Sequence, residues 1–475
     1  MPVSPAYHPD IRHPALGDAF YVPVQPADFP KHILRFRNDR WAKRVGLDTL
    51  TDEEWIAHCG RFEPLPDNLP NPLALRYHGH QFRVYNPELG DGRGFLYAQL
   101  REGQSGRLLD LGTKGSGQTP WSRQGDGRLT LKGGVREILA TEMLEALGVN
   151  TSKTFSLIET GEALYRGDEP SPTRSAVLVR LSHGHIRFGT FQRLLVTGQA
   201  AEKRTLVDYV IETYWPEAAD SSEPVIALYT AIMRALARKG AQWFAAGFVH
   251  GVLNTDNMAI TGESFDYGPW RFLPVLDPGF TAAYFDNAGL YSFGRQPEAL
   301  HWNLARLAEC LLDLAPQEKL EEVIGQFGQL FEDELVLQTF WRLGLEVRDM
   351  DQAQELTRAF YAALRESGAP YEQAFFDLAL GAEAARLEKS PSAEIYRSDT
   401  FADLLRAIRG AAPAIATSKN AYFDGPGPVT MLVEDVEAIW TDIDKNDDWT
   451  SLERKVGEIR AMGDAYAGIP RGNPI

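Results

Sequence analysis

Three side chains able to bind a cation or accept a proton lie close together in the middle of the chain. Asp256 and Asn257 are adjacent, at the end of an apolar segment that begins at Gly247, and Asp266 follows within one loop. Their oxygens suit a hard cation such as Mg²⁺, and one carboxylate would remain to act as a base. This set is typical of a nucleotide-using transferase. Asp and Asn are also favoured turn residues, so this segment alone leaves a structural role open.

Glycine is concentrated between residues 90 and 134. Twelve of the chain's 42 glycines fall there, about three times an even spread. Glycine lets backbone N–H groups surround a phosphate because no Cβ obstructs them, although hairpin turns also use it. The main clusters also carry charged side chains, which makes a phosphate site more plausible than turns alone. The candidate phosphate-binding residues in this stretch are Gly90, Gly92, Arg93, Lys114, Asp126 and Gly127.

Lys114 precedes a helix that periodicity predicts over residues 134–147, with Gly148 ending it. The helix should supply an acidic partner for Lys114, unless that lysine is simply a solvated loop residue. Glu142 projects into the middle of the apolar arc, where an unpaired carboxylate would be costly, and Glu137 lies nearer its edge. Periodicity slightly favours Glu142, and both stay candidates.

Arg180 and Arg187 flank a candidate tight turn at 183–184. A two-residue turn would place the two arginines opposite each other on one side of a sheet, where like charges are destabilising. At 4 Å they repel by roughly 4 kcal/mol at an effective dielectric near 20. A bound polyphosphate would reverse the sign of this interaction, so the pattern predicts a phosphate site. With a different loop length the arginines would not face each other, and carboxylates such as Asp126 could neutralise their charge instead. In either case the pattern would not predict a phosphate site.

The composition favours a soluble protein of 475 residues with a sizeable core. The formal net charge of -17 argues against a nucleic-acid or anionic-membrane partner, since such surfaces need clustered Lys and Arg. The two cysteines, Cys59 and Cys310, have no metal-ligand spacing and suit a reducing compartment. The sequence shows no transmembrane run or signal peptide, so we expect a cytoplasmic protein.

The order of predicted elements indicates an α+β protein. Residues 1–60 form a Pro-rich, aromatic extension, residues 61–200 a strand-rich lobe with one helix, and residues 201–475 a mostly helical lobe. Helices are expected over 205–215, 224–246, 298–314 and 317–331, among others. The acidic cluster falls at the junction of the two lobes. This is the bilobal layout of a protein-kinase-like fold.

The chain resembles the selenoprotein O family (SelO, also called YdiU), whose members are kinase-like protein adenylyltransferases. The resemblance is co-linear over roughly residues 15 to 300 and is highly specific. The matching segments are Phe20–Gln25, Tyr77–Phe82, Gly90–Gly94, Leu111–Thr119, Gly125–Gly127, Arg180–His185, His250–Met258, Asp266–Pro269 and Leu276–Phe280.

The resemblance implies a role for each candidate. Asp256 would be the catalytic base, Asn257 and Asp266 would bind Mg²⁺ or Mn²⁺, and Glu137 would pair with Lys114. The nucleotide, ATP, would lie flipped relative to ordinary kinases, so that AMP passes to Ser, Thr or Tyr hydroxyls of client proteins or of the enzyme itself. The remaining residues would hold the nucleotide and its phosphates: Gly90, Gly92, Arg93, Lys114, Asp126, Gly127, Arg180 and Arg187.

Two features depart from the family pattern. Some members end in a selenocysteine or cysteine motif, and the sequence Arg471–Ile475 lacks one, so redox control through such a tail is not expected. Asp277 follows the apolar run 272–276 and is a rival to Asp266 as a metal ligand, or else part of an Asp-Pro-Gly turn. Two other functions stay open on this scaffold: transfer of the γ-phosphate by a kinase, and a silent ATP-binding pseudokinase.

Overall fold

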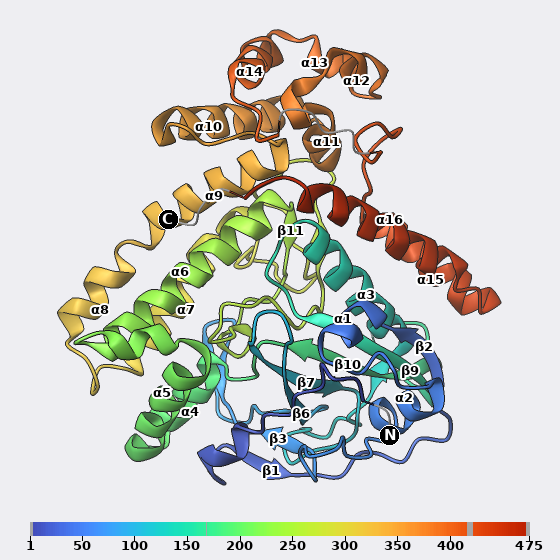
Figure 1. Cartoon of the computed structure of the whole chain (residues 1–475), viewed down its shortest axis with the longest axis vertical. Helices are drawn as coiled ribbons and strands as arrows, with labels where there is room; N and C mark the ends of the chain where they lie inside the picture. Colours follow the sequence, from blue (N-terminus) through green and yellow to red (C-terminus); the bar gives the residue numbers. More distant parts are fainter. Residues whose placement is uncertain (1–2, 168, 416–420, 472–475) are drawn as a thin grey trace.

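The computed structural model describes residues 3–167, 169–415 and 421–471. It shows an antiparallel sheet in the first part of the chain and helices in the rest (Figure 1). The predicted α+β class is therefore confirmed. Within the described residues, none of the helices combines the length and the apolar character needed to span a bilayer. Residues 1–2 and 472–475, which bear on the expectations about a leader and a C-terminal motif, lie outside the described residues.

The main sheet has eight strands in antiparallel pairs. Strands β1 and β2 come from residues 1–60, so the expected extension is built into the sheet. In spatial order the strands are β1 (Tyr21–Pro23), β3 (Leu73–Leu75), β6 (Leu96–Arg101), β7 (Leu108–Lys114), β10 (Thr173–Ser182), β9 (Lys153–Leu164) and β2 (Ile33–Arg37), and β8 (Leu129–Thr130) pairs separately with β10.

The two faces of this sheet bury different helices. Val177 and Val179 of β10 pack in one core with Trp41 and Trp55, which the N-terminal helices α1 and α2 contribute. Leu178 packs on the other face with helix α3. Side chains alternate along a strand, so Arg180 shares the α3 face with Leu178. The bounds of these helices are α1 (Asp39–Arg44), α2 (Asp52–Cys59) and α3 (Leu131–Ala146).

Helix α3 begins three residues earlier than periodicity predicted. Thr130 caps it, because its Oγ1 accepts a hydrogen bond from the N–H of Gly133 at 3.1 Å. Gly148 follows the helix with a φ of +82°, a conformation that favours glycine. The two glycines 133 and 134 hid the true first turn, since glycine is unfavourable inside helices.

The rest of the chain is mainly helical. The helix expected over 317–331 is in fact two, α8 and α9, separated at Gly325 and Gln326. The helix expected over 298–314 begins at Gln296 and ends at Glu309. The bounds are α4 (Phe188–Val196), α5 (Ala200–Tyr214), α6 (Pro224–Ala245), α7 (Gln296–Glu309), α8 (Gln317–Ile324), α9 (Phe327–Leu343), α10 (Met350–Ser367), α11 (Tyr371–Ala382), α12 (Ala384–Lys389), α13 (Ala393–Tyr396), α14 (Asp399–Gly410), α15 (Val433–Asn446) and α16 (Thr450–Ala467).

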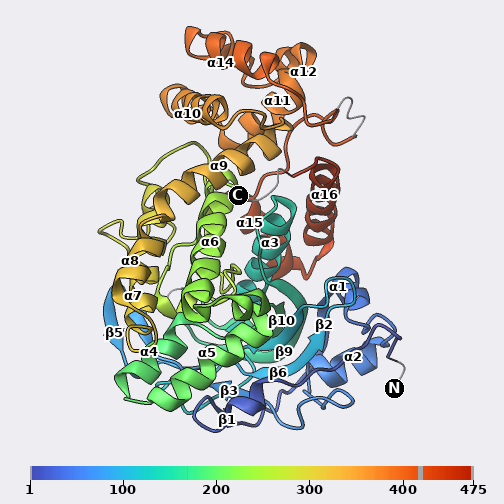
Figure 2. The same cartoon turned by 60° about the vertical axis from the view of Figure 1, so that its left-hand side comes forward.

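The last helix returns to brace α3, and Figure 2 shows the two side by side. Arg460 of α16 donates two hydrogen bonds, of 2.8 and 2.7 Å, to the buried carboxylate of Glu142. Asn38 also faces that carboxylate at 3.4 Å. Glu142 is thus a structural residue whose charge is neutralised from the far end of the chain.

We expect Arg460→Ala to lower the free energy of unfolding by about 2–3 kcal/mol, because the buried carboxylate of Glu142 then keeps only Asn38 and, at 3.8 Å, Arg40 as partners. Arg454→Ala is the matched control, since Arg454 is exposed and lies 4.0 Å from Glu458. It should change stability by less than about 0.5 kcal/mol. Urea unfolding measures both variants, and equal effects would contradict the role given to Arg460.

Candidate functional site

A cavity of about 730 Å³ lies where the sheet meets the helical part. It is lined by strands β7 and β10, by the glycine-rich loops and by the segment 252–266 that follows α6. Of the candidate residues named from the sequence, all but Glu137, Glu142 and Asp277 line this one cavity. They are Gly90, Gly92, Arg93, Lys114, Asp126, Gly127, Arg180, Arg187, Asp256, Asn257 and Asp266.

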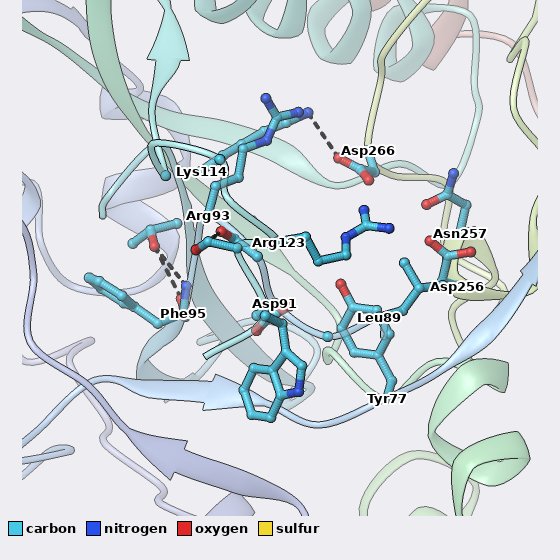
Figure 3. A pocket seen from close by; sticks show the side chains of 18 of the residues that line it. Tyr77, Leu89, Asp91, Arg93, Phe95, Lys114, Arg123, Asp256, Asn257 and Asp266 are labelled. Atoms are coloured by element: carbon cyan, nitrogen blue, oxygen red, sulfur yellow. Dashed lines mark hydrogen bonds and ion pairs between the residues drawn. The ribbon is translucent and has the colours of Figure 1, made fainter. Parts of the chain in front are cut away.

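Lys114, the last residue of strand β7, forms ion pairs with two carboxylates. Its Nζ forms an ion pair with Glu137 of α3. It forms another, at 2.9 Å, with Asp266, which Figure 3 shows. Lys114 is thus paired with Glu137, whereas Glu142 is paired with Arg460. The preference that periodicity gave to Glu142 was wrong, because an apolar arc cannot reveal an arginine from a distant helix.

The hairpin predicted at 183–184 does not form. Arg180 lies on β10 opposite Gly112 of β7, and the chain leaves the sheet after Ser182. Arg187 instead pairs with Ala259 in an isolated antiparallel bridge. The two arginines nevertheless converge, because both guanidinium groups lie over the ring of Phe265, at 5.2 and 5.0 Å from its centroid.

Both arginines are buried and incompletely satisfied. Within the described residues, Nε and Nη1 of Arg180 and Nε of Arg187 have no hydrogen-bond partner. Arg187 does donate through Nη1 to the backbone carbonyl of Asp256 at 2.9 Å, and its Nη2 lies 3.5 Å from Asp91. Buried donors without acceptors are costly, so this part of the cavity favours an anionic ligand.

Asp256 and Asn257 belong to the short 3₁₀ turn Thr255–Asn257, which neighbouring side chains hold in place. The Oγ1 of Thr255 accepts a hydrogen bond from the N–H of His80 at 2.6 Å. The Oδ1 of Asn254 accepts one from the N–H of Phe82 at 3.0 Å. The pairing of Arg187 with Ala259 extends this anchoring on the other side. The turn is therefore positioned before any ligand arrives.

The two carboxylates have opposite electrostatic surroundings. Burial raises the pKa of Asp256 to about 6, although Arg187 opposes the shift. Burial also acts to raise the pKa of Asp266, but Lys114, Arg180 and Arg187 outweigh it and hold that pKa well below its ordinary value. Oδ1 of Asp256 is buried without a hydrogen-bond partner among the described residues. Asp256 is thus the better proton acceptor and Asp266 a permanent negative charge.

Asn257 and Asp266 offer two oxygen ligands for a hard cation. The Nδ2 of Asn257 donates to the backbone carbonyl of Val252 at 3.1 Å, which leaves its Oδ1 free for another partner. In the described ranges, His, Cys, Asp and Glu form no group of three or more that could hold a metal. Mg²⁺ is commonly bound by one or two protein ligands together with substrate phosphates. The residues therefore fit a cation that binds with a phosphorylated ligand.

Asp277, the rival to Asp266, is exposed and accepts a hydrogen bond from the N–H of Gly279 at 2.8 Å, so it is a turn residue outside the cavity.

Asp266 itself has a φ of +63°. A non-glycine residue in this region stores strain and is typical of functional sites. The cysteines Cys59 and Cys310 are free and buried, and burial raises the pKa of each thiol to about 12.

The glycine-rich segments pack against each other as well as facing the cavity. A Cβ on Gly90 would lie 2.5 Å from the ring of Trp121, and one on Gly127 would lie 2.2 Å from the carbonyl carbon of Gly117. Asp126 forms an ion pair with Arg166 at 2.8 Å. These glycines are therefore required by close packing, in addition to any phosphate contact.

We expect Gly90→Ala to weaken binding of ATP, the nucleotide that the family resemblance implies, about tenfold, because Trp121 must move and the loop over the cavity moves with it. A loss of about 1.4 kcal/mol gives this factor. The backbone of Gly90 is not left-handed, so the clash is the only cost. The control is Gly457→Ala in helix α16, where nothing lies within 4 Å. It should leave the Kd unchanged. Calorimetric titration with ATP tests both, and unaltered binding by Gly90→Ala would refute the packing role.

Sequence reasoning missed several residues of this site. The rings of Tyr77 and Phe265 form cation–π contacts with the arginines, and the guanidinium of Arg187 lies 4.4 Å from the Tyr77 centroid. Asp91 faces Arg187, and Arg123 lines the cavity. Asp91 and Arg123 lie inside the glycine-rich stretch, so its charged residues could have been included as a set. Tyr77 begins one of the segments that match the family, whereas nothing local marks Phe265.

Clustered buried cations beside an unpartnered carboxylate make this cavity a candidate site for a phosphorylated substrate. The family described as protein adenylyltransferase SelO matches residues 3–460, and the chain belongs to this family of nucleotidyltransferases, which confirms the resemblance seen in the sequence. Among similar proteins, one from Gloeobacter violaceus is 45% identical over 460 residues, covering 94% of this chain and 93% of its own. One from Trichormus variabilis is 48% identical over 378 residues, covering 78% and 76%. One from Vibrio cholerae is 38% identical over 400 residues, covering 81% and 80%. All three are named protein nucleotidyltransferase YdiU.

Proposed function

We propose that this enzyme transfers AMP from ATP to Ser, Thr or Tyr hydroxyls of client proteins, or of its own chain, with release of pyrophosphate. The observation that carries the proposal is the buried pair Arg180 and Arg187, with unsatisfied donors, in the same cavity as the free Oδ1 of Asp256. The cations suit a polyphosphate, and the carboxylate suits an acceptor hydroxyl. The family description, protein adenylyltransferase, agrees with this chemistry.

In the transfer step, each side chain of the candidate site has one role. The acceptor hydroxyl gives its proton to Asp256 as its oxygen forms a bond to the α-phosphorus. The bond from that phosphorus to the bridging oxygen of the β-phosphate breaks, and pyrophosphate leaves with the bonding electrons. Lys114, Arg180 and Arg187 hold the outer phosphates and neutralise the leaving group. A divalent cation held by Asn257 and Asp266 would supply further neutralisation of phosphate charge.

Transfer of AMP requires the α-phosphorus to lie next to Asp256. Under this proposal the β- and γ-phosphates occupy the region of Lys114, Arg180 and Arg187, and the nucleotide has the flipped orientation that the family resemblance implies. The opposite orientation would make the same residues a kinase site. Lys114 and Arg180 lie 2.9 and 3.9 Å from Asp266 rather than at Asp256, and this supports the flipped arrangement, since the outer phosphates carry most of the charge.

We also propose a protein-kinase-like scaffold, with the lobes 61–200 and 201–475 and the extension 1–60. The pairing of Lys114 on a sheet strand with Glu137 on the helix α3 supports it, because kinases use such a pair to orient phosphates. Strands β1 and β2 tie the extension to the first lobe.

The direct test uses ATP labelled at the α- or the γ-phosphate, with Mg²⁺, and with casein and the enzyme itself as acceptors. Intact mass spectrometry identifies the adduct. The proposal predicts incorporation of the α-label alone and an added AMP. Incorporation of the γ-label would identify a kinase. Absence of either label from both acceptors, with ATP bound, would favour a silent nucleotide-binding protein.

A further inference from the structure

Loop 117–127 contains a tight turn at the cavity whose central residues are strained. The N–H of Gly125 donates to the carbonyl of Ser122 at 2.7 Å, which closes a four-residue turn. Its central residues, Arg123 and Gln124, have φ of +45° and +68°. Turns of this kind normally place Asn or Gly at these positions, because other side chains are costly there.

Contacts on both sides hold the strained turn. Trp121 packs against Gly90, and the Oγ of Ser122 donates to the carbonyl of Gly92 at 2.6 Å. The Nε2 of Gln118 donates to the carbonyl of Gly125 at 2.7 Å. A strained conformation persists only where its surroundings enforce it, and such positions cluster at functional sites.

The side chain presented by this turn is a cation without a partner. Arg123 lines the cavity together with Asp256 (Figure 3), and it makes no hydrogen bond or ion pair with any described residue. Two other cations at the cavity are paired instead: Arg128 lies 2.9 Å from Glu162, and Arg166 lies 2.8 Å from Asp126. Arg123 is exposed at the cavity and unpaired among the described residues, so its charge is available for a ligand that enters.

We propose that Arg123 is a further catalytic residue, which donates hydrogen bonds to the non-bridging oxygens of the α-phosphoryl group while it moves from pyrophosphate to the acceptor. The strained turn aims the guanidinium at the place where negative charge develops, and the planar fork of arginine matches phosphoryl oxygens. This inference rests on the proposed AMP transfer and adds to it a residue from loop 117–127.

The test compares three variants by the initial rate of AMP incorporation into casein at saturating ATP, by the Kd for a non-hydrolysable ATP analogue, and by thermal unfolding. Arg123→Gly should lower the rate about 100-fold, the usual effect of losing one donor to a developing charge. Its Kd should change less than about threefold and its Tm should not fall, because glycine relaxes the turn. Added guanidinium chloride, below unfolding concentrations, should restore part of the rate.

Gln124→Gly is the matched control, because it relaxes the same turn and keeps the arginine, and it should retain the wild-type rate within about threefold. Arg123→Lys should recover only part of the rate, since a lysine cannot form the bidentate contact. A wild-type rate for Arg123→Gly, an equal loss in Gln124→Gly, or a defect confined to Kd would overturn the role of Arg123. Failure of the wild-type enzyme to incorporate AMP would instead overturn the proposed function.

Discussion

Asp256→Asn is expected to reduce AMP incorporation about 1000-fold while ATP binds as tightly as before or more tightly. Asparagine has the shape of aspartate but cannot accept the proton, and loss of a general base typically costs 10²- to 10⁴-fold, roughly. ATP binding should not weaken because a negative charge leaves a cavity built for phosphates. Stability should hold or rise, since burial disfavours the charged form of Asp256.

The matched control is Asp277→Asn, which makes the same chemical change in an exposed turn outside the cavity. Its incorporation rate should remain within about twofold of wild type, as for most surface substitutions. Rates of α-label incorporation and ATP titrations on both variants give the comparison. A fully active Asp256→Asn enzyme, or an equally impaired Asp277→Asn enzyme, would remove Asp256 from its assigned role.

Lys114→Met is expected to impair both stability and nucleotide binding. The substitution leaves Glu137 buried without its cation and removes one partner of Asp266. Removing one member of a buried pair costs about 3 kcal/mol in the free energy of unfolding. Losing a charged donor to phosphate costs about 2 kcal/mol, which corresponds to roughly 30-fold weaker ATP binding.

The double variant Lys114→Met, Glu137→Gln separates these two effects. It should recover at least about half of the lost stability, because Glu137 is then neutral, yet ATP binding should stay weak. Lys132→Met on α3 is the control: its partner Glu437 is about half exposed, and the change should cost less than about 0.5 kcal/mol. Urea unfolding and calorimetry measure all three. Recovery of ATP binding in the double variant would show that Lys114 acts only by neutralising Glu137.

The sequence was sufficient to find most of the site because its key residues lie in short segments. Asp256, Asn257 and Asp266 share one loop region, and Lys114 ends a strand within the glycine-rich stretch. Local order therefore predicts that these groups meet. The α+β class followed in the same way from the change between strand-like and helical periodicity.

What local patterns could not decide depends on contacts between distant residues. The choice between Glu137 and Glu142 is settled by Arg460, which lies on the last helix. The meeting of Arg180 and Arg187 depends on Phe265 and on the bridge between Arg187 and Ala259, and the predicted hairpin gave the right neighbours for the wrong reason. Strain at Arg123 is likewise visible only in the folded backbone.

A crystal structure with a non-hydrolysable ATP analogue and Mg²⁺ tests the central claim most directly, through the distances from the Asp256 carboxylate to the three phosphorus atoms. The α-phosphorus should lie nearest to that carboxylate, with the β- and γ-phosphates among Lys114, Arg180 and Arg187. A complex in which the γ-phosphorus lies nearest to Asp256 would contradict AMP transfer and assign the same residues to a kinase.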